Sequence, residues 1–258
     1  MPIITLTTDF GSRDPYVAAM KGVLRRHCPD ATIDDLTHEI TPQDILETAL
    51  FLEAAMPWYP EDTVHLVVVD PGVGTKRRPI AARAGGHIFV GPDNGLMTLW
   101  LLRHQLEWAF QIKAGTNANA VISNTFHGRD IFAPAAAWLA NGGEPHALGE
   151  AIDSLQQLQL PLPKRNGLYH HGIIIHIDRF GNCVTNIQRE QEAHPSPGGT
   201  IHVGDHVFPL HTTYGDVDAG APLALYGSSG RLEIAVNQGN AARQFGLARM
   251  MAVTLKAT

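Results

Sequence analysis

The chain has 258 residues, enough for one large domain or two small ones, and its 44% of hydrophobic residues is ordinary for a globular protein. The net charge of −6 and the 7% of aromatic residues argue against a general nucleic-acid binder. No apolar run approaches the ~18 residues that cross a bilayer, the first residues begin a strand without a basic leader, and two cysteines are too few for a disulfide framework or a cysteine-rich zinc site. We therefore expect a cytoplasmic protein that binds neither nucleic acid nor a membrane.

The first 157 residues alternate between strand-like and helical periodicity, which predicts an N-terminal α/β domain. Strands are expected at 3–7, 31–36, 64–69 and 87–90, and helices at 16–27, 42–55, 94–104 and 130–140. The run 64–69 is apolar throughout, as is typical of a strand covered on both faces. Strands that alternate with helices favour a mainly parallel sheet sandwiched between helices, with right-handed crossovers.

The pattern changes near residue 158. Residues 158–167 contain two prolines and a glycine without periodicity, and we interpret them as a linker. Short β-rich segments separated by turn residues follow, at 172–177, 199–203, 206–210, 222–226, 232–236 and 251–255. They predict a smaller C-terminal domain over residues 168–258, folded as an antiparallel β-barrel.

Polar and glycine-rich segments follow the predicted strands of the N-terminal domain. They read TTDFG (7–11), DPGVG (70–74), GPDNG (91–95) and, before the last helix, TFHGRD (125–130). Ligands of open α/β sheets bind at the carboxyl ends of the strands. We therefore expect a small-molecule site at one edge of the sheet, with Asp9, Asp70 and His127 among its side chains and Arg77 close by.

Some of the polar residues in these segments have simpler interpretations. Asp93 is expected to form a turn, Asp130 to cap the helix that follows it, and Arg78 to be a solvated surface charge. Carboxylates and histidine could hold a metal ion, but these four segments contain no His-x-His, His-Glu-x-x-His or closely spaced aspartate pair. No Gly-x-Ser-x-Gly elbow or phosphate-binding loop occurs either. The residues alone leave the reaction open.

Six segments together resemble the S-adenosylmethionine (SAM) hydroxide adenosyltransferase family, whose members are SAM hydrolases related to enzymes that make 5′-halo-adenosines. In chain order they are TTDFGSRDPYVAAMKG, DPGVGTKRR, GPDNG, TFHGRDIFAP, IDRFGNCVTNI and YGSSGRLEIAVNQGNAA. The resemblance implies an α/β N-terminal domain and a β-barrel C-terminal domain. It also implies a homotrimer that binds SAM between the N-terminal domain of one subunit and the C-terminal domain of its neighbour, with no cofactor.

The resemblance assigns roles to individual residues. A hydrolytic triad falls on Asp70, Arg77 and His127, and halogenating members lack it, so the triad implies water as the nucleophile. The remaining matches concern SAM itself: Asp9 for the ribose diol with Asp14 and Tyr16 in the same stretch, Asp178, Ser228 and Ser229 for the methionine end, and Phe180, Asn182 and the backbone at Val236 for adenine. Gln43 departs from some halogenating relatives, which have Trp at that site.

The chemistry of SAM is consistent with these residues. SAM is a sulfonium, so attack at C5′ releases a neutral thioether and needs neither a general acid nor a metal. The water must be held in line with the C–S bond; Asp70 can accept its hydrogen bond, His127 can accept or relay its proton, and Arg77 can orient Asp70. Three alternatives remain: a purely structural Asp70–Arg77 salt bridge, a metal-dependent nucleotide or nucleoside hydrolase, and a non-catalytic SAM- or adenosine-binding protein.

Overall fold

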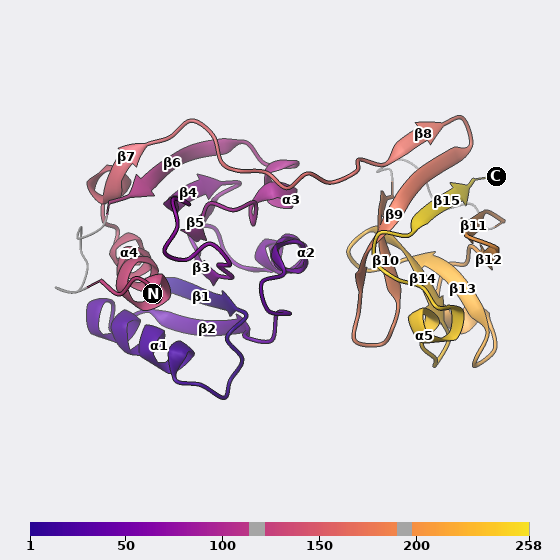
Figure 1. Cartoon of the computed structure of the whole chain (residues 1–258), viewed down its shortest axis with the longest axis horizontal. Coiled ribbons are helices and arrows are strands. Elements are labelled where there is room, and N and C mark those ends of the chain that lie inside the picture. The colour runs from indigo at the N-terminus through magenta and orange to yellow at the C-terminus, as the bar shows by residue number, and fades with distance from the viewer. Residues whose placement is uncertain (114–121, 190–197, 258) are drawn as a thin grey trace. The chain divides into compact units, whose positions relative to one another are not determined.

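The computed structural model describes residues 1–113, 122–189 and 198–257. The chain divides into two compact units, Met1–Leu158 and Gln159–Thr258, which are coloured indigo to magenta and orange to yellow in Figure 1. Over the described ranges, no helix is long and apolar enough to cross a membrane. Each unit has its own sheet and its own buried apolar core.

The N-terminal unit is built on a seven-stranded sheet with the order β2-β1-β3-β5-β4-β6-β7. Strands β2, β1, β3 and β5 pair in parallel, and β4 lies antiparallel between β5 and β6, so β6 again runs with the parallel group. The expected mainly parallel sheet is therefore confirmed. The strands are β1 (Ile3–Thr8), β2 (Thr32–Thr37), β3 (Val64–Val68), β4 (Pro79–Ala84), β5 (His87–Pro92), β6 (Leu106–Ile112) and β7 (Gly149–Ala151).

Strands β4, β6 and β7 were not predicted from the sequence. Strand β4 reads PIAARA, and alanine has little intrinsic preference for strands. Strand β7 has only three residues. The sequence of β6, LEWAFQI, does not alternate regularly between buried and exposed residues, so its strand signal is weak. These strands owe their conformation to the pairing of their neighbours.

Helices cover both faces of the N-terminal sheet (Figure 1). Helices α1 (Tyr16–His27) and α4 (Ala133–Ala140) pack against one face, while α2 (Ile45–Ala55) and α3 (Thr98–Leu101) pack against the other. A π-helical turn, Gly128–Phe132, leads directly into α4. Short 3-10 turns follow α2 and precede β7, at Met56–Trp58 and Pro145–Leu148. The expected α/β sandwich is confirmed.

Three predicted helices have different bounds in the structure. The helix expected at 130–140 is the π-helical turn Gly128–Phe132 followed by α4. The helix expected at 42–55 begins at Ile45, because Asp44 is its N-cap and accepts a hydrogen bond from the backbone of Glu47, and Gln43 before it has a φ of 66°. The helix expected at 94–104 is only the four-residue α3. Gly95, with a φ of 104°, cannot belong to a right-handed helix.

The C-terminal unit is an eight-stranded antiparallel sheet with the order β12-β11-β15-β9-β10-β14-β13, to which β8 is added beside β9. Leu210, just after β12, forms a bridge with Ala224 in β13, so the two ends of the sheet meet as in a barrel. The expected antiparallel barrel is confirmed. Its strands are β8 (Lys164–Asn166), β9 (Tyr169–Ile177), β10 (Cys183–Gln188), β11 (Thr200–Val203), β12 (His206–Pro209), β13 (Pro222–Tyr226), β14 (Arg231–Val236) and β15 (Ala252–Lys256).

All six strands predicted in this region exist, with ends that differ by at most three residues. Strands β8 and β10, helix α5 (Ala241–Phe245) and the 3-10 turn Tyr214–Asp216 were not predicted. Strand β10 alternates strictly between buried and half-buried residues, a pattern that identifies it as a strand in retrospect.

Candidate active site

Asp70, Arg77 and His127 lie together in the N-terminal unit. Asp70 follows β3, Arg77 comes seven residues later, and His127 stands just before the π-helical turn that leads into α4. Arg77 Nε donates to Oδ1 and Oδ2 of Asp70 at 2.8 and 3.0 Å, and its Nη2 also donates to Oδ2. The two side chains are only 9% and 6% exposed. This is a buried, forked charge pair of the kind that fixes a carboxylate in one orientation.

His127 is joined to the pair through Arg77. Its Nδ1 lies 2.8 Å from Arg77 Nη2. A guanidinium only donates, so Nδ1 must accept, and the neutral ring carries its proton on Nε2. Burial lowers the pKa of His127, the Arg77 charge lowers it further, and Asp70 and Asp130 partly oppose this. In this arrangement neither ring nitrogen can accept a proton from water, and Nε2–H is a donor.

A cavity of about 310 Å³ adjoins the triad. Asp70 and His127 belong to its wall. So do Asp9 and Tyr16, which the resemblance assigned to the ribose side, and also Gln43 and Phe126. The rings of Phe10, Tyr16 and Phe126 pack within 5.3–6.1 Å of one another along it. Gln43 N–H donates to Oδ2 of Asp9 at 2.8 Å, which fixes that carboxylate. Asp14 is exposed and is not part of this wall.

Two simpler expectations for this edge of the sheet are wrong. Asp130 does not cap α4; it is buried, and its carboxylate accepts from the backbone of Ser123 at 2.9 Å and from Arg129 at 2.6 Å. Arg78 is not a solvated charge, because it donates to the buried carboxylate of Asp93. The Arg78–Asp93 pair could not be identified from local sequence patterns, because the pairing of β4 with β5 brings the two residues together. Asp93 directly follows β5, is buried and pairs with Arg78, in agreement with the expectation that its role is structural.

The C-terminal unit has a second pocket, of about 720 Å³. Five of the six residues that the resemblance assigned to this half of the chain line it: Asp178, Phe180, Asn182, Ser228 and Val236. Ser229 does not. Phe180 is 73% exposed, so its ring is available for stacking rather than used in the core.

Asp178 shapes the turn that carries two of these residues. Its Oδ1 accepts from the backbone N–H groups of Phe180 and Asn182 at 2.9 and 2.8 Å, and its Oδ2 accepts from Asn182 Nδ2 at 3.0 Å. An aspartate that binds the backbone two residues on is a typical turn former. Asp178 therefore fixes the position of Phe180 and Asn182 beside the pocket.

Glu233 and Tyr214 line the same pocket, and the sequence analysis missed both. Tyr214 donates its hydroxyl to Glu233 Oε2 at 2.9 Å. Burial raises the pKa of Glu233, nearby Asp178 raises it further, and the tyrosine hydrogen bond opposes this. A Cβ at Gly227 would lie 1.7 Å from Glu233 Oε1, so only glycine leaves room for this carboxylate. The sequence signal that could have identified Glu233 is the position of a glutamate inside the otherwise apolar strand RLEIAV, because a charged residue there needs a specific partner or ligand.

No group of three or more His, Cys, Asp or Glu side chains is arranged to hold a metal ion within residues 1–113, 122–189 and 198–257. The polar groups that line the two pockets are carboxylates, amides, hydroxyls and the ring of His127. Such groups suit an uncharged or cationic organic ligand that offers hydroxyl, amine and ring-edge donors.

Comparisons with known proteins agree with this architecture. Residues 4–149 match the model of the SAM hydroxide adenosyltransferase N-terminal domain, and residues 172–254 match that of its C-terminal domain. A protein of Thermus thermophilus named (R)-S-adenosyl-L-methionine hydrolase is 44% identical over 96% of this chain and 97% of its own length. A fluorinase of an Actinoplanes species is 29% identical over 98% and 97% of the two chains.

The fold is also found among solved structures. An uncharacterised conserved protein from Thermotoga maritima is 34% identical, has a TM-score of 0.90, and is matched over 98% of this chain and 99% of its own. One domain model matches each of the two units, and the similarity to the hydrolase extends over nearly the full length of both proteins. This chain is a member of the SAM hydroxide adenosyltransferase family.

Proposed function

We propose that this protein hydrolyses SAM to adenosine and L-methionine. The observation that carries the proposal is the Asp70–Arg77–His127 group at the wall of a cavity that also contains Asp9. The names of relatives at 37–44% identity, (R)-S-adenosyl-L-methionine hydrolase, support the same reaction.

The reaction requires one bond to form and one to break. The water oxygen attacks C5′, the C5′–S bond breaks, and its electron pair remains on the sulfur of methionine. As the C–O bond forms, the oxygen becomes strongly acidic, so a carboxylate held by a guanidinium is a sufficient base. Asp70 accepts the hydrogen bond of the water, stabilises the growing positive charge and takes the proton.

Arg77 and His127 act by positioning in this proposal. Arg77 donates to Asp70 through Nε and Nη2 and to the ring of His127 through Nη2, and its guanidinium also lies 5.1 Å from the ring centre of Phe132. A clamp that is fixed from several sides keeps the Asp70 carboxylate in line with the C–S bond. The Nε2–H of His127 offers a further donor to a ligand in the cavity.

The substrate is divided between two sets of residues in this proposal. Asp9 binds the ribose diol through the oxygen that Gln43 does not occupy, with Tyr16 in the same cavity wall. The family resemblance adds Asp14, which lies outside that wall. The C-terminal residues Phe180, Asn182 and Val236 bind adenine, and the methionine head group is bound by Asp178, Glu233 and Ser228. The family resemblance adds Ser229, which follows Ser228 but does not line the pocket. Two carboxylates suit an ammonium group.

The assembly in this proposal is a homotrimer, in which the N-terminal pocket of one subunit and the C-terminal pocket of its neighbour bind one SAM molecule. The family resemblance supports this arrangement. The proposal includes no metal and no cofactor, since the leaving thioether is neutral and needs no activation.

The proposal is tested by incubating the purified protein with SAM and excess EDTA and following adenosine and methionine by chromatography. We expect equal amounts of both products at an unchanged rate. Activity that EDTA abolishes and a divalent ion restores would instead identify a metal-dependent hydrolase. SAM binding without any product would identify a non-catalytic SAM-binding protein.

A further inference from the structure

Asp93 and Asn94, in the GPDNG segment after β5, contact the chain on both sides of the loop that carries Asp70 and Arg77. Asn94 Nδ2 donates to the backbone oxygen of Val69 at 3.0 Å. Val69 is fully buried and immediately precedes Asp70. It lies one residue beyond β3, where the ladder between β3 and β5 has ended. The amide of Asn94 therefore supplies the donor that a further residue of a neighbouring strand would have supplied.

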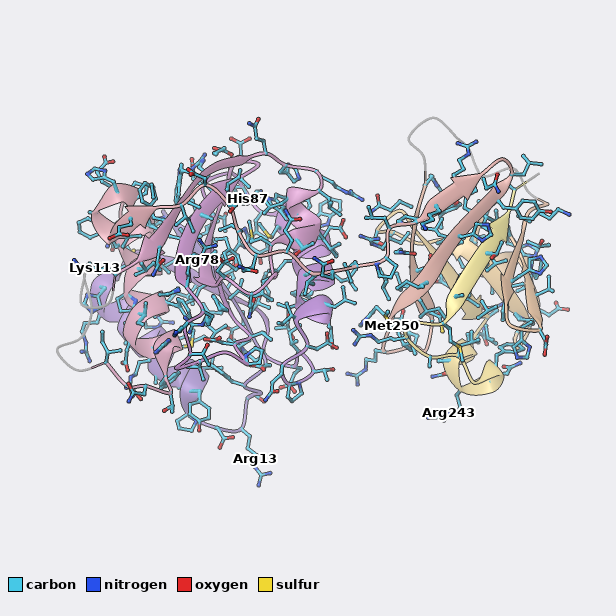
Figure 2. All side chains as sticks on the ribbon, turned by 45° about the horizontal axis from the view of Figure 1, so that its top comes forward. Arg13, Arg78, His87, Lys113, Arg243 and Met250 are labelled. Atoms are coloured by element: carbon cyan, nitrogen blue, oxygen red, sulfur yellow. The ribbon has the colours of Figure 1, made fainter. Side chains whose placement is uncertain are left out.

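Asp93 holds the other end of the loop. Its backbone N–H donates to the backbone oxygen of Arg78 at 2.9 Å, and Arg78 directly follows Arg77. Arg78 Nε donates to Asp93 Oδ2 at 2.8 Å, and Arg78 Nη2 donates to the same oxygen. The Asp93 side chain is 2% exposed and that of Arg78 is 29% exposed. Figure 2 shows Arg78 among the strands of the N-terminal unit, whereas Arg13 projects away from it.

The Asp93–Arg78 pair is itself held from a third side. Gln156 N–H donates to Asp93 Oδ1 at 2.7 Å, and Arg78 Nη2 donates to the backbone oxygen of Ser154 at 2.9 Å. Both oxygens of Asp93 are thus engaged. A buried carboxylate with donors on both oxygens has one stable orientation, so the pair is a rigid support for the loop.

The loop itself has few internal contacts of this kind. Its backbone hydrogen bonds are Val73 N–H to the oxygen of Asp70, at 3.2 Å, and Thr75 N–H to the oxygen of Gly72, at 3.1 Å. The Thr75 hydroxyl adds a bond to the Gly72 oxygen at 2.7 Å and accepts from the Arg77 N–H at 3.3 Å. Pro71, Thr75 and Lys76 are exposed. Apart from the direct Asp70–Arg77 pair, the positions of these two residues consequently depend on where the two ends of the loop are anchored.

We infer that Asp93 and Asn94 are positioning residues that hold Arg78 and Val69 and thereby keep Asp70 and Arg77 in their reactive geometry. This inference rests on the proposed hydrolysis of SAM. Neither residue lines the cavity beside the triad. Their effect is transmitted through the backbone at Val69 and Arg78, and a displacement of about 1 Å at a reacting group can cost roughly 100-fold in rate.

The test uses two variants that change one anchor each. Asn94→Asp keeps the size of the side chain but places an oxygen against the Val69 carbonyl. Arg78→Lys keeps the charge but loses the forked geometry. The matched control is Arg83→Lys in β4, five residues after Arg78, where Arg83 donates to Glu107 and Asp62 at 2.8 and 2.5 Å, away from the loop.

We expect kcat for SAM hydrolysis to fall about 10- to 100-fold in Asn94→Asp and in Arg78→Lys, with KM near that of the wild type. The control should keep the wild-type kcat. Hydrogen exchange of the peptide spanning residues 69–78, measured by mass spectrometry, should be faster in both anchor variants and unchanged in the control. Melting temperatures of all three variants verify that they are folded.

The two proposals fail in different ways. A wild-type protein without SAM hydrolysis would overturn the proposed function, and loop exchange would then decide by itself whether the anchors hold the loop. With an active wild type, anchor variants that match Arg83→Lys in kcat and in exchange would overturn the positioning role. Faster exchange without loss of kcat would also overturn it.

Discussion

Asp70 is engaged by Arg77 through both of its oxygens, yet a carboxylate has room for further donors, so water can still bind to it. Replacing Asp70 by Asn keeps the shape but removes the charge and places an amide group against Arg77. We expect the rate of adenosine formation in Asp70→Asn to fall at least ~100-fold, as for the loss of one preorganised electrostatic group. The affinity for SAM, measured by calorimetry, should change far less.

The control for this change is Asp62→Asn. Asp62 also pairs with an arginine, Arg83, but its side chain is 72% exposed, and it is not part of the cavity beside the triad. Its turnover should equal that of the wild type. If Asp70→Asn also kept normal turnover, the Asp70–Arg77 pair would be a structural salt bridge and no more.

His127 predicts a particular pH dependence of turnover. Protonation at Nδ1 would break its hydrogen bond to Arg77, and burial followed by the Arg77 charge lowers its pKa below the ordinary value of about 6.5. Turnover should therefore stay constant as the pH falls through 6.5 and decline only below it. In His127→Gln, whose amide oxygen can accept from Arg77 but does not titrate, this acid limb should disappear. A limb centred above 6.5, or one retained in His127→Gln, would contradict this role.

The two ends of the ligand can be separated by variants of Asp9 and Glu233. Adenosine has the ribose diol but no ammonium group, so Glu233→Gln should weaken binding of SAM and spare adenosine, whereas Asp9→Asn should weaken both. Losing one charge-assisted hydrogen bond costs roughly 1.5–3 kcal/mol, or about 10- to 150-fold in affinity.

Calorimetric titration of both variants with both ligands gives the SAM/adenosine affinity ratio. Glu233 is a cleaner target than Asp178, because Asp178 also holds the turn with Phe180 and Asn182. The opposite pattern, with adenosine binding lost in Glu233→Gln and the ratio changed in Asp9→Asn, would mean that the ends of the ligand are assigned to the wrong pockets.

At the scale of elements, β3 and β5 are joined by a buried pair of histidines. His65 Nε2 lies 3.1 Å from His87 Nδ1, and the hydroxyl of Thr5 in β1 lies 2.8 Å from His65 Nδ1. Burial and then His87 lower the pKa of His65 to about 3. Burial and then His104 lower the pKa of His87. Both rings are therefore neutral in the folded protein at neutral pH.

This pair makes the stability depend on pH in a defined window. Above about pH 6.5 histidine is neutral in the unfolded chain as well, so the pair makes its full contribution to the free energy of unfolding. Between 6.5 and 3 the unfolded chain binds a proton that folded His65 does not, so the free energy of unfolding falls by up to about 1.4 kcal/mol per pH unit. Urea unfolding at about pH 7.5 and pH 5.5 should give a smaller difference for His65→Gln than for the wild type. Equal differences would contradict the neutral buried pair.

At the scale of the whole molecule, the proposed trimer makes a prediction about mixed assemblies. Asp70→Asn impairs the N-terminal pocket, and Glu233→Gln impairs the C-terminal pocket. Each variant alone should hydrolyse SAM slowly when the SAM concentration is below the Kd of that variant for SAM. If one site uses pockets from two neighbouring subunits, a random mixture of both variants has about a quarter of its sites intact. Co-expression of the two chains with different tags should therefore restore about a quarter of the wild-type rate. No restoration would mean that a single chain supplies each site.

The amino-acid sequence by itself determined the kinds of domain and most of their elements. Helix α1 has the predicted bounds, and the strands of the barrel lie where the β-rich segments were found, because amphipathic period and turn residues are local properties. The order of six short segments was enough to indicate the family, and this resemblance assigned Asp70, Arg77 and His127 to one group. In the structure, the loop after β3 and the π-helical turn bring these three side chains together.

Only the tertiary structure decided how the individual side chains pair. Arg77 and Arg78 are adjacent and chemically identical, yet Arg77 binds Asp70 and His127, and Arg78 binds Asp93. Successive side chains of extended chain point to opposite sides, so one arginine reaches the site and the other reaches its support. Likewise, Glu233 reaches the pocket because Gly227, across the β13–β14 hairpin, leaves space for it. Such pairings depend on strand order and on contacts distant in sequence, which local patterns do not contain.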